Sequence, residues 1–536
     1  MATAGVAELR RLRAALPAVL VLLAAPLAGQ GTDTLRAVTL ERRSVFDPSE
    51  SSFWLLNLVN KLHITTRPYV IRREVLLRAG EPYDSASAAE TARNLRRLGV
   101  FRLVSVDTAR TDSGLVATVT TRDGWSTRPD FRFRSTGGEI AYTLAMIEDN
   151  LLGTATQASL LYQKNPDRST TTLGFRQPRL IRGKLGLAFA LQNRSDGELA
   201  AGSFGQPFYT LASTHSWTVE GDTRRERVLR FRDGIEQATD TLQRRYTLAR
   251  AEIARAVRAS RFGYTRVGVA AQVRRDDFAT QSVFDLDGIG ARTLTGAVGG
   301  YVEHRRARFA VVRGYNAQSR DEDIDLSTIV RGTLWLAPTA LGYDDDGVAP
   351  GIYARTGATL PWGFAVVEGA AQGLVTSAGV DSGSVQLAGT LAWVPSPVHL
   401  AVFHATAGMI RNPLPGSEFD LGLGVGPRAF RQHAFTGDRS FFTTAEYRWG
   451  ALTDFLNVVD IGVAAFGDYG GAWYSGERRR TGWDVGVGLR LGASRAPDLE
   501  ANRIDLAYRS GNDREPAGWV LVVAKGFTFS SGLRGR

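Results

Sequence analysis

The C-terminal part of the chain alternates between apolar side chains and a mixture of glycine and charged side chains. After Gly482, one parity holds Val485, Val487, Leu489 and Leu491, and the other holds Gly486, Gly488, Arg490 and Gly492. The last run repeats this, with Trp519, Leu521, Val523, Phe527 and Phe529 against Val520, Ala524, Gly526 and Thr528. Because side chains of a strand alternate between faces, each run predicts a strand with one apolar face. That pattern is typical of strands between lipid and a polar lumen.

A closed barrel is the membrane structure that fits this alternation. In hydrocarbon every backbone N–H and C=O needs a partner, so only helices and closed barrels span. Beyond residue 30 we find no run of roughly 18 continuous apolar residues, the length that a spanning helix requires. The mean hydropathy of −0.13 is compatible with strands that carry apolar side chains at every other position.

The N-terminal residues 1–30 are predicted to be a secretory signal peptide. Arg10, Arg11 and Arg13 form a basic region, Ala14–Leu27 is a short apolar core, and Ala28 with Gly29 offers small residues for cleavage. A membrane anchor is the alternative interpretation of this segment.

Residues 33–126 differ from the rest because their apolar period is partly helical. Pro68 is expected to open one helix, which Gly80 stops, and a capping box at Ser87–Glu90 to open another, which Gly99 stops. A strand is expected near Leu35–Leu40, and two more follow Gly99 on either side of a turn at Thr111–Gly114. The predicted order is strand, helix, helix, strand, strand in a small α+β domain.

From residue 127 onward strands dominate, separated by recurrent turn sequences. These are Asn165-Pro166-Asp167, Ser195-Asp196-Gly197, Arg232-Asp233-Gly234, Asp285-Leu286-Asp287-Gly288 and Asp344-Asp345-Asp346-Gly347. Upstream of residue 411 the pattern leaves between 11 and 14 strands open. After Arg439 it predicts five, at about 440–449, 458–469, 482–493, 502–509 and 517–529.

Composition narrows the chemistry that the chain can perform. The absence of cysteine excludes disulfides and thiolate metal sites. The net charge of +11 comes from scattered arginines with no basic stripe, which argues against a nucleic-acid partner. Acidic runs at Asp321–Asp325 and Asp344–Asp346 match no Ca²⁺ loop spacing and are interpreted as surface loops. His63 is expected to be structural, and without a nucleophile motif we expect no catalytic residue, metal, cofactor or enzyme activity.

The segment 33–126 resembles a POTRA domain. The residues that carry the resemblance are the second predicted helix and its exit into a strand: Glu90, Leu95, Leu98, Gly99, Phe101 and Val104. Ser51–Thr65 departs from that pattern as an insertion between the first strand and the first helix. The resemblance implies a periplasmic domain that receives unfolded strands and could bind periplasmic accessory proteins.

The segment 127–536 resembles the barrel of the BamA/TamA superfamily. Three motifs carry the resemblance: Arg428-Ala429-Phe430 followed by Gly437-Asp438, Ala445-Glu446-Tyr447-Arg448, and Phe466-Gly467-Asp468-Tyr469-Gly470. In the family the first motif lies on a loop folded into the lumen and has glycine where Ala429 stands. Arg313 in Val312-Arg313-Gly314-Tyr315 matches that motif literally, but too many strands would follow it, so we interpret Arg313 as a strand residue. The resemblance implies a mainly β fold, a 16-stranded antiparallel transmembrane barrel.

Strand parity adds a test that does not depend on the family. Glu446 lies opposite in parity to Ala445 and Tyr447, and Asp468 lies opposite in parity to the apolar Ile461, Val463 and Ala465. Both carboxylates are therefore expected to point inward, as is Arg490 on the glycine face of its strand. A lumenal Arg428 would meet Asp468, and also Glu446 if the loop lies close enough. Solvated lumenal charges are the alternative.

The resemblance implies insertion or translocation of other proteins at the bacterial outer membrane, with membrane lipid and unfolded clients as partners. The barrel would open between a first strand near Glu139–Met146 and a last strand near Trp519–Phe529, weakened by Gly518 and Gly526. Phe527 and Phe529 are expected to supply a C-terminal strand signal, with Ser530–Arg536 as a tail. A passive pore and a secretion channel dedicated to one cargo remain the alternatives.

Overall fold

The computed structural model describes residues 33–45, 63–136, 139–180, 185–232, 234–238, 241–280, 294–317, 321–494, 500–512 and 514–529. The predicted signal peptide, residues 51–62 of the expected insertion, the turn at 285–288 and the C-terminal tail lie outside the described residues.

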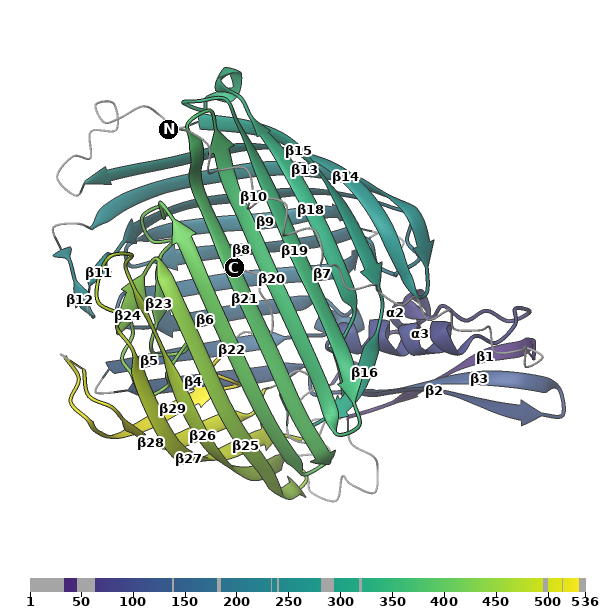
Figure 1. Ribbon diagram of the computed structural model, residues 1–536. Helices are drawn as coiled ribbons and strands as arrows, with labels where there is room; N and C mark the ends of the chain where they lie inside the picture. The colour runs from purple at the N-terminus through teal and green to yellow at the C-terminus, as the bar shows by residue number, and fades with distance from the viewer. Residues whose placement is uncertain are drawn as a thin grey trace, which may run out of the picture.

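The described N-terminal elements form a small α+β module. In order they are β1 (Leu35–Arg43), α2 (Pro68–Glu74), α3 (Ser85–Arg97), β2 (Phe101–Thr111) and β3 (Gly114–Asp123). They follow the predicted order, and β3 lies in the middle of the sheet, parallel to β1 and antiparallel to β2. In Figure 1 the module (purple) lies at one side of the barrel, where β16 is labelled.

Local sequence explains where the two helices begin, but α2 ends at Glu74 and not at the expected Gly80. Pro68 occupies the first turn of α2, where its missing N–H has no cost. The predicted capping box at Ser87 was wrong, because Asp84 caps α3 by accepting hydrogen bonds from the backbone N–H groups of Ala86 and Ser87. Gly99 follows α3 with a φ of 74°. Within the described residues, no helix combines the length and the apolar content needed to cross a membrane.

The remaining wall of the molecule is one closed antiparallel barrel, shown in Figure 1, with twenty strands among the described residues. Its strands are β4 (Thr127–Thr136), β5 (Glu139–Glu148), β6 (Gln157–Lys164), β7 (Ser169–Leu180), β8 (Leu185–Arg194), β9 (Gly197–Gln206), β10 (His215–Val228), β13 (Leu242–Ser260), β14 (Gly263–Thr280), β15 (Leu294–Arg306), β18 (Thr328–Ala337), β19 (Gly347–Leu360), β20 (Gly363–Thr376), β21 (Gly379–Ser396), β22 (His399–Arg411), β25 (Arg439–Phe455), β26 (Val459–Trp473), β27 (Gly482–Ala493), β28 (Asn502–Arg509) and β29 (Gly518–Lys525). The short 3-10 helices Leu151–Gly153 and Thr339–Leu341 lie in connections.

The prediction of 16 strands was wrong, although the five strands after Arg439 were located, the last of them extended beyond its end at Lys525. Fifteen described strands, not 11 to 14, precede the long connection after β22. The first of them is β4, and the expected first strand at Glu139–Met146 is the second, β5. The charged residues of β4, Arg128, Asp130, Arg132 and Arg134, share one parity, and Phe131 and Phe133 share the other, so β4 does alternate and was overlooked. Pro129 lies in the part of β4 that has no registered partner on β29 among the described residues, and such edge positions tolerate proline.

Three connections carry two-stranded ribbons of their own. They are β11 (Phe231–Arg232) with β12 (Ile235–Glu236), β16 (Phe309–Arg313) with β17 (Asp321–Asp325), and β23 (Phe419–Leu421) with β24 (Phe435–Gly437). Arg313 is a strand residue as predicted, though in a ribbon rather than in the wall. The interpretation of Asp321–Asp325 as a surface loop was wrong, because these residues form β17 and pair with basic residues. Asp344 to Asp346 are exposed.

The two faces of the wall differ as the alternation predicts. On β27, Val485, Val487 and Leu489 are 44–60% exposed, whereas Asp484 and Arg490 on the opposite parity have no exposed surface. An apolar outer face over a polar interior is the arrangement that suits lipid outside and polar groups inside.

Candidate functional site

The connection between β22 and β25, residues 412–438, folds into the barrel and carries Arg428. The side chain of Arg428 is 1% exposed. Its Nε and Nη2 donate to the two carboxylate oxygens of Asp468 at 2.7 and 3.1 Å. Its Nη1 donates to Glu446 at 2.9 Å and to Asp505 at 3.2 Å. A planar guanidinium is suited to such a fork, because its donors lie at fixed angles in one plane.

The carboxylates that bind Arg428 come from three strands of the barrel wall. Glu446, Asp468 and Asp505 belong to β25, β26 and β28, and each is buried at the inward parity of its strand. The ring of Phe466, two residues before Asp468, lies 3.6 Å from the guanidinium carbon of Arg428 and covers one of its faces. Every polar edge of the guanidinium therefore faces a carboxylate or hydroxyl, and one flat face contacts an aromatic ring.

Further arginines complete what we call the lumenal arginine cluster: Arg428, Arg448, Arg490 and Arg503 with Glu446, Asp468 and Asp505. Arg490 donates to Asp505 at 2.5 Å and to Glu446 at 3.1 Å. Arg448 donates to Glu446 at 2.6 Å, and Arg503 lies 3.7 Å from Asp505. Glu446 and Asp505 are each shared between Arg428 and arginines of the wall, and Asp468 binds Arg428 alone among the arginines of the cluster. With the bond from Ala429 to Asp484, these contacts tie the loop to four neighbouring strands of the wall.

The backbone of the loop motif is held as firmly as its side chain. The N–H of Ala429 donates to Asp484 at 3.1 Å, and its carbonyl accepts from Arg509 at 2.9 Å. Ala429 is fully buried and is not among the described non-glycine residues with positive φ. Alanine is therefore compatible with this position, although the family motif has glycine there.

Glycines make room for the aromatic residues of the loop. Phe430 is fully buried, and a Cβ on Gly482 would lie 2.3 Å from its ring. The Phe430 and Phe435 ring centroids are 5.1 Å apart. A Cβ on Gly437 would lie 2.1 Å from the carbonyl carbon of Trp473. The end of the loop therefore approaches β26 so closely that only glycine fits at this position.

The other residues of the predicted motifs fix the end of the loop. The side chain of Asp438 accepts a hydrogen bond from the backbone N–H of Ser475 at 2.8 Å, and its carbonyl accepts one from Ile410 at 2.8 Å. A Cβ on Gly470 would lie 2.7 Å from the carbonyl oxygen of Phe441. The structure thus brings Arg428, Glu446, Asp468 and Arg490 together and places Asp438 and Gly470 at the edge of the same region.

Sequence reasoning missed several members of the cluster. Asp505 is fully buried and bridges two arginines, and Asp484, Arg448 and Arg503 also face inward. Parity was the signal that could have found them. Arg448 shares the parity of Glu446, and Arg503 and Asp505 alternate with the outward Ile504 and Leu506 on β28.

The C-terminal end differs from the prediction. β29 ends at Lys525, and Phe527 and Phe529 lie inside the barrel rather than on its apolar outer face. Gly526 turns the chain with a φ of 67°, and a Cβ there would lie 2.4 Å from a carboxylate oxygen of Glu500. The ring of Phe529 stacks on His404 at 3.9 Å. The two phenylalanines therefore anchor the segment that follows β29 in the interior.

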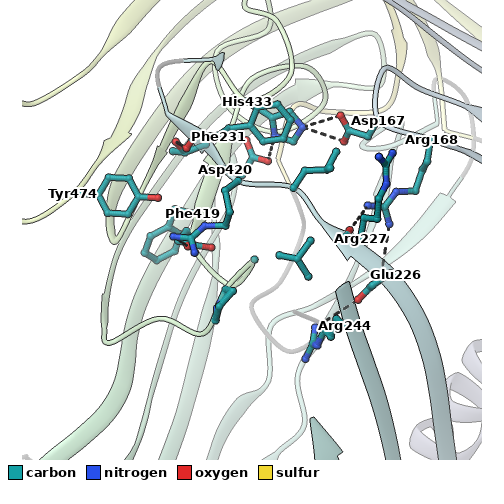
Figure 2. A pocket seen from close by; sticks show the side chains of 17 residues that line it. Asp167, Arg168, Glu226, Arg227, Phe231, Arg244, Phe419, Asp420, His433 and Tyr474 are labelled. Carbon is teal, nitrogen blue, oxygen red and sulfur yellow. Dashed lines mark hydrogen bonds and ion pairs between the residues drawn. The ribbon is translucent and has the colours of Figure 1, made fainter. Parts of the chain in front are cut away.

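A polar cavity of about 210 Å³ lies where the loop meets β10 and the β6–β7 connection. Figure 2 shows His433 of the loop in its lining, between Asp167 and Asp420. The ring of Phe231 stacks on His433 at 3.6 Å. Burial lowers the pKa of His433, but hydrogen bonds to Asp167 and Asp420 outweigh it and raise the pKa to about 9. A protonated His433 therefore holds two carboxylates from separate segments.

The contacts of the site hold the loop to the barrel wall. The cluster is composed of arginine–carboxylate pairs, with the hydroxyl of Thr444 3.5 Å from Arg428. Across the described ranges, no group of three or more histidine and carboxylate side chains could hold a metal ion. Nε2 of His63 lies 2.9 Å from a carboxylate oxygen of Asp123, near the start of α2.

Comparisons with known proteins complete this description. No family model and no curated protein matches the chain. Among solved structures, CdiB from Escherichia coli has a TM-score of 0.46 and 12% identity, covering 91% of this chain and 76% of that chain. CdiB from Acinetobacter baumannii has a TM-score of 0.43 and 10% identity, covering 92% and 74%.

BamA from Haemophilus ducreyi, in a structure lacking POTRA domains 1–3, has a TM-score of 0.37 and 11% identity, covering 91% of this chain and 84% of that chain. These identities and TM-scores are too low to carry an activity from one protein to another. These solved structures of BamA and CdiB are what the chain is similar to over most of its length.

Proposed function

We propose that this chain inserts or translocates other proteins at the bacterial outer membrane through a seam between β4 and β29. The observation that carries the proposal is the weakness of that seam. Val523 and Ser135 are the single registered pair between the two strands among the described residues. By contrast, β29 pairs with β28 through eight residues and β4 pairs with β5 through ten.

The inward turn at Gly526 explains why the seam is short. Continuing the register of Val523 and Ser135 would bring residue 526 opposite Arg132, but the chain leaves the wall at that point. Thr127–Arg132 of β4 therefore has no partner strand on its seam side within the described part of the chain. Unpaired strand edges are templates for another strand, and in a membrane they need a partner.

The lumenal arginine cluster supports the same proposal. It lies on β25 to β28, directly beside the seam strand β29, and fixes the loop to that side of the wall. A wall segment braced in this way can stay rigid while its neighbour β29 separates from β4. The interior also holds the loop, the chain end and β16–β17, whereas a wide passive pore requires an open lumen.

The N-terminal module is proposed to lie in the periplasm and to act as a POTRA-like receiver of clients. Its β1 and β2 are the edge strands of a three-stranded sheet, so an unfolded segment could add to either edge. Membrane lipid would contact the apolar outer face of the barrel, and periplasmic accessory proteins would bind to the module.

Depletion of the protein in its native host, followed by quantification of outer-membrane proteins, tests this function. The proposal predicts reduced levels of some outer-membrane or exported proteins, which wild-type protein restores. Restoration with an Arg428→Ala variant should be poor, whereas Arg431→Ala, in the same loop but half-exposed, should restore normally. Unchanged protein levels on depletion, with altered permeability to small solutes, would support a passive pore instead.

A further inference from the structure

We propose that the β16–β17 ribbon is a mechanical link that couples the N-terminal module to the chain end beside the seam. The ribbon comprises Phe309–Arg313, Asp321–Asp325 and the described residues 314–317 between them. It contacts the module, the barrel wall and the segment after β29. The inference builds on the proposed function, because it concerns what controls the seam.

The module end of the link is a bidentate ion pair. Arg96 of α3 donates from Nε and Nη2 to the two oxygens of Asp323, at 2.6 and 2.8 Å. One helical turn earlier, the guanidinium of Arg93 lies over the ring of Phe309 at 4.3 Å. Both strands of the ribbon are thus attached to the same face of one helix. A bidentate pair fixes orientation as well as distance, so a rotation of α3 is transmitted to β17.

The base of the ribbon is fixed to the wall. Asp325 accepts a hydrogen bond from Arg305 of β15 at 2.7 Å, and Arg355 of β19 lies 3.5 Å from it. A Cβ on Gly357 would lie 2.7 Å from the Cα of Leu326, so the root of the ribbon rests directly on β19. The ribbon can therefore tilt about this root rather than slide along the wall.

The far end of the ribbon meets the chain end and the lumenal arginine cluster. Tyr315 is 5% exposed, and its ring lies 5.2 Å from the rings of both Phe364 and Phe527. The carbonyl of Tyr315 accepts from Arg448 at 3.2 Å, and the carbonyl of Asn316 accepts from the N–H of Ala501 at 3.1 Å. Phe527 is two residues beyond the end of β29, so Tyr315 contacts the segment that leaves the seam.

Hydrogen bonds to the carboxylate of Glu322 connect the two ends of the ribbon. The carboxylate of Glu322 accepts from the backbone N–H groups of Asn316 and Ala317 at 2.8 and 2.9 Å, and from the Asn316 side chain at 2.7 Å. Glu322 precedes Asp323, the residue that holds the module. Displacement of α3 therefore reaches Tyr315 through adjacent residues and then reaches Phe527 by ring contact. Such a path establishes coupling only when a change at one end alters the other.

The test measures the seam in the protein alone, without a client. Ser135→Cys with Val523→Cys places two thiols at the seam pair that is registered among the described residues, in a chain that has no other cysteine. Disulfide formation requires the two Cα atoms to approach within about 7 Å, so its rate in lipid bilayers reports closure of the seam. Arg96→Ala is expected to slow the reaction about fivefold, a typical size for such coupling. The charge exchange of Arg96→Asp with Asp323→Arg is expected to recover most of the rate.

Arg261→Ala provides the matched control. Arg261 forms another ion pair between the barrel and the module, to Asp84 at 2.9 Å, but it does not touch the ribbon. A rate within about twofold of the parent for Arg96→Ala would overturn the proposal. An equal effect of Arg261→Ala would also overturn it, because any loosening of the module would then act on the seam. The crosslinking rate can depend on Arg96 even if the protein assembles no client, and clients can be assembled even if the rate does not depend on Arg96. The two proposals are therefore tested separately.

Discussion

Arg428 and Asp468 form a bidentate hydrogen-bonded ion pair inside the barrel, with N···O distances of 2.7 and 3.1 Å. Asp468 also accepts the backbone N–H of Arg428 at 3.2 Å. One carboxylate therefore fixes the side chain and the backbone of the loop residue at once. Because both residues are almost fully buried, neither can exchange its partner for water without first opening the interior.

Arg428→Ala should destabilise the barrel strongly. Removing the guanidinium leaves the carboxylates of Glu446, Asp468 and Asp505 buried with fewer partners, and breaking a buried pair costs about 3–5 kcal/mol. Arg428→Lys should lose less, because the ammonium keeps the charge but cannot form the fork. The midpoint and slope of urea unfolding of the purified protein measure both effects.

Arg431→Ala is the control for that series. Arg431 lies in the same loop, but its side chain is 48% exposed and its nearest carboxylate is 3.8 Å away. Its removal should change the free energy of unfolding by less than about 0.5 kcal/mol. Equal unfolding midpoints for the Arg428 and Arg431 variants would show that the cluster does not stabilise the loop.

Gly526→Ala should destabilise the chain end, whereas Gly518→Ala at the other end of β29 should not. Gly526 has a φ of 67° and leaves no space for a Cβ beside Glu500, but a Cβ on Gly518 meets nothing within 4 Å. Alanine at a positive φ costs about 1–2 kcal/mol. Thermal unfolding midpoints compare the two variants, and an equal shift would contradict the inward turn at residue 526.

The stability of the loop should depend on pH through His433. Its pKa is raised from 6.5 to about 9, so its stabilising contribution is complete below pH 6.5 and is lost as the pH rises through about 9. The upper limit of the effect is about 3 kcal/mol. Urea unfolding of the parent at pH 6 and pH 10 should therefore differ, with the lower stability at the higher pH.

His433→Gln tests the assignment of that pH dependence. Glutamine can still donate a hydrogen bond to Asp167 or Asp420 but carries no titrating charge. The variant should lose most of the stability difference between the two pH values. A pH profile identical to that of the parent would assign the effect to another group.

Much of the candidate site was predictable because strand parity is a strict geometric rule. Glu446, Asp468 and Arg490 were placed inward from the alternation of their neighbours, and the structure places all three around Arg428. The last five strands were located for the same reason. The helices of the module were predicted from Pro68 and Gly99, which punctuate helices by their backbone preferences.

The features that were predicted wrongly depend mostly on contacts between segments that are far apart in the sequence. The number of strands is an exception, because the charged residues of β4 all lie on one parity and the strand could have been recognised from its alternation. Phe527 and Phe529 have the parity of the outer face, but the turn at Gly526 breaks the alternation and brings them inside. The acidic run at Asp321–Asp325 looked like a solvated loop, because nothing near it in sequence reveals that Arg96 binds Asp323.

Closing the seam covalently tests the central claim most directly. The parent chain has no cysteine, so Ser135→Cys with Val523→Cys can be oxidised to lock the seam and reduced to release it. Leu506→Cys with Leu521→Cys, a registered pair within the continuous β28–β29 ladder, is the control. In liposomes supplied with an unfolded outer-membrane barrel protein, the oxidised seam variant should fail to assemble the client and should recover after reduction, while the control pair stays active in both states. Equal client assembly by the locked and unlocked seam would contradict the account.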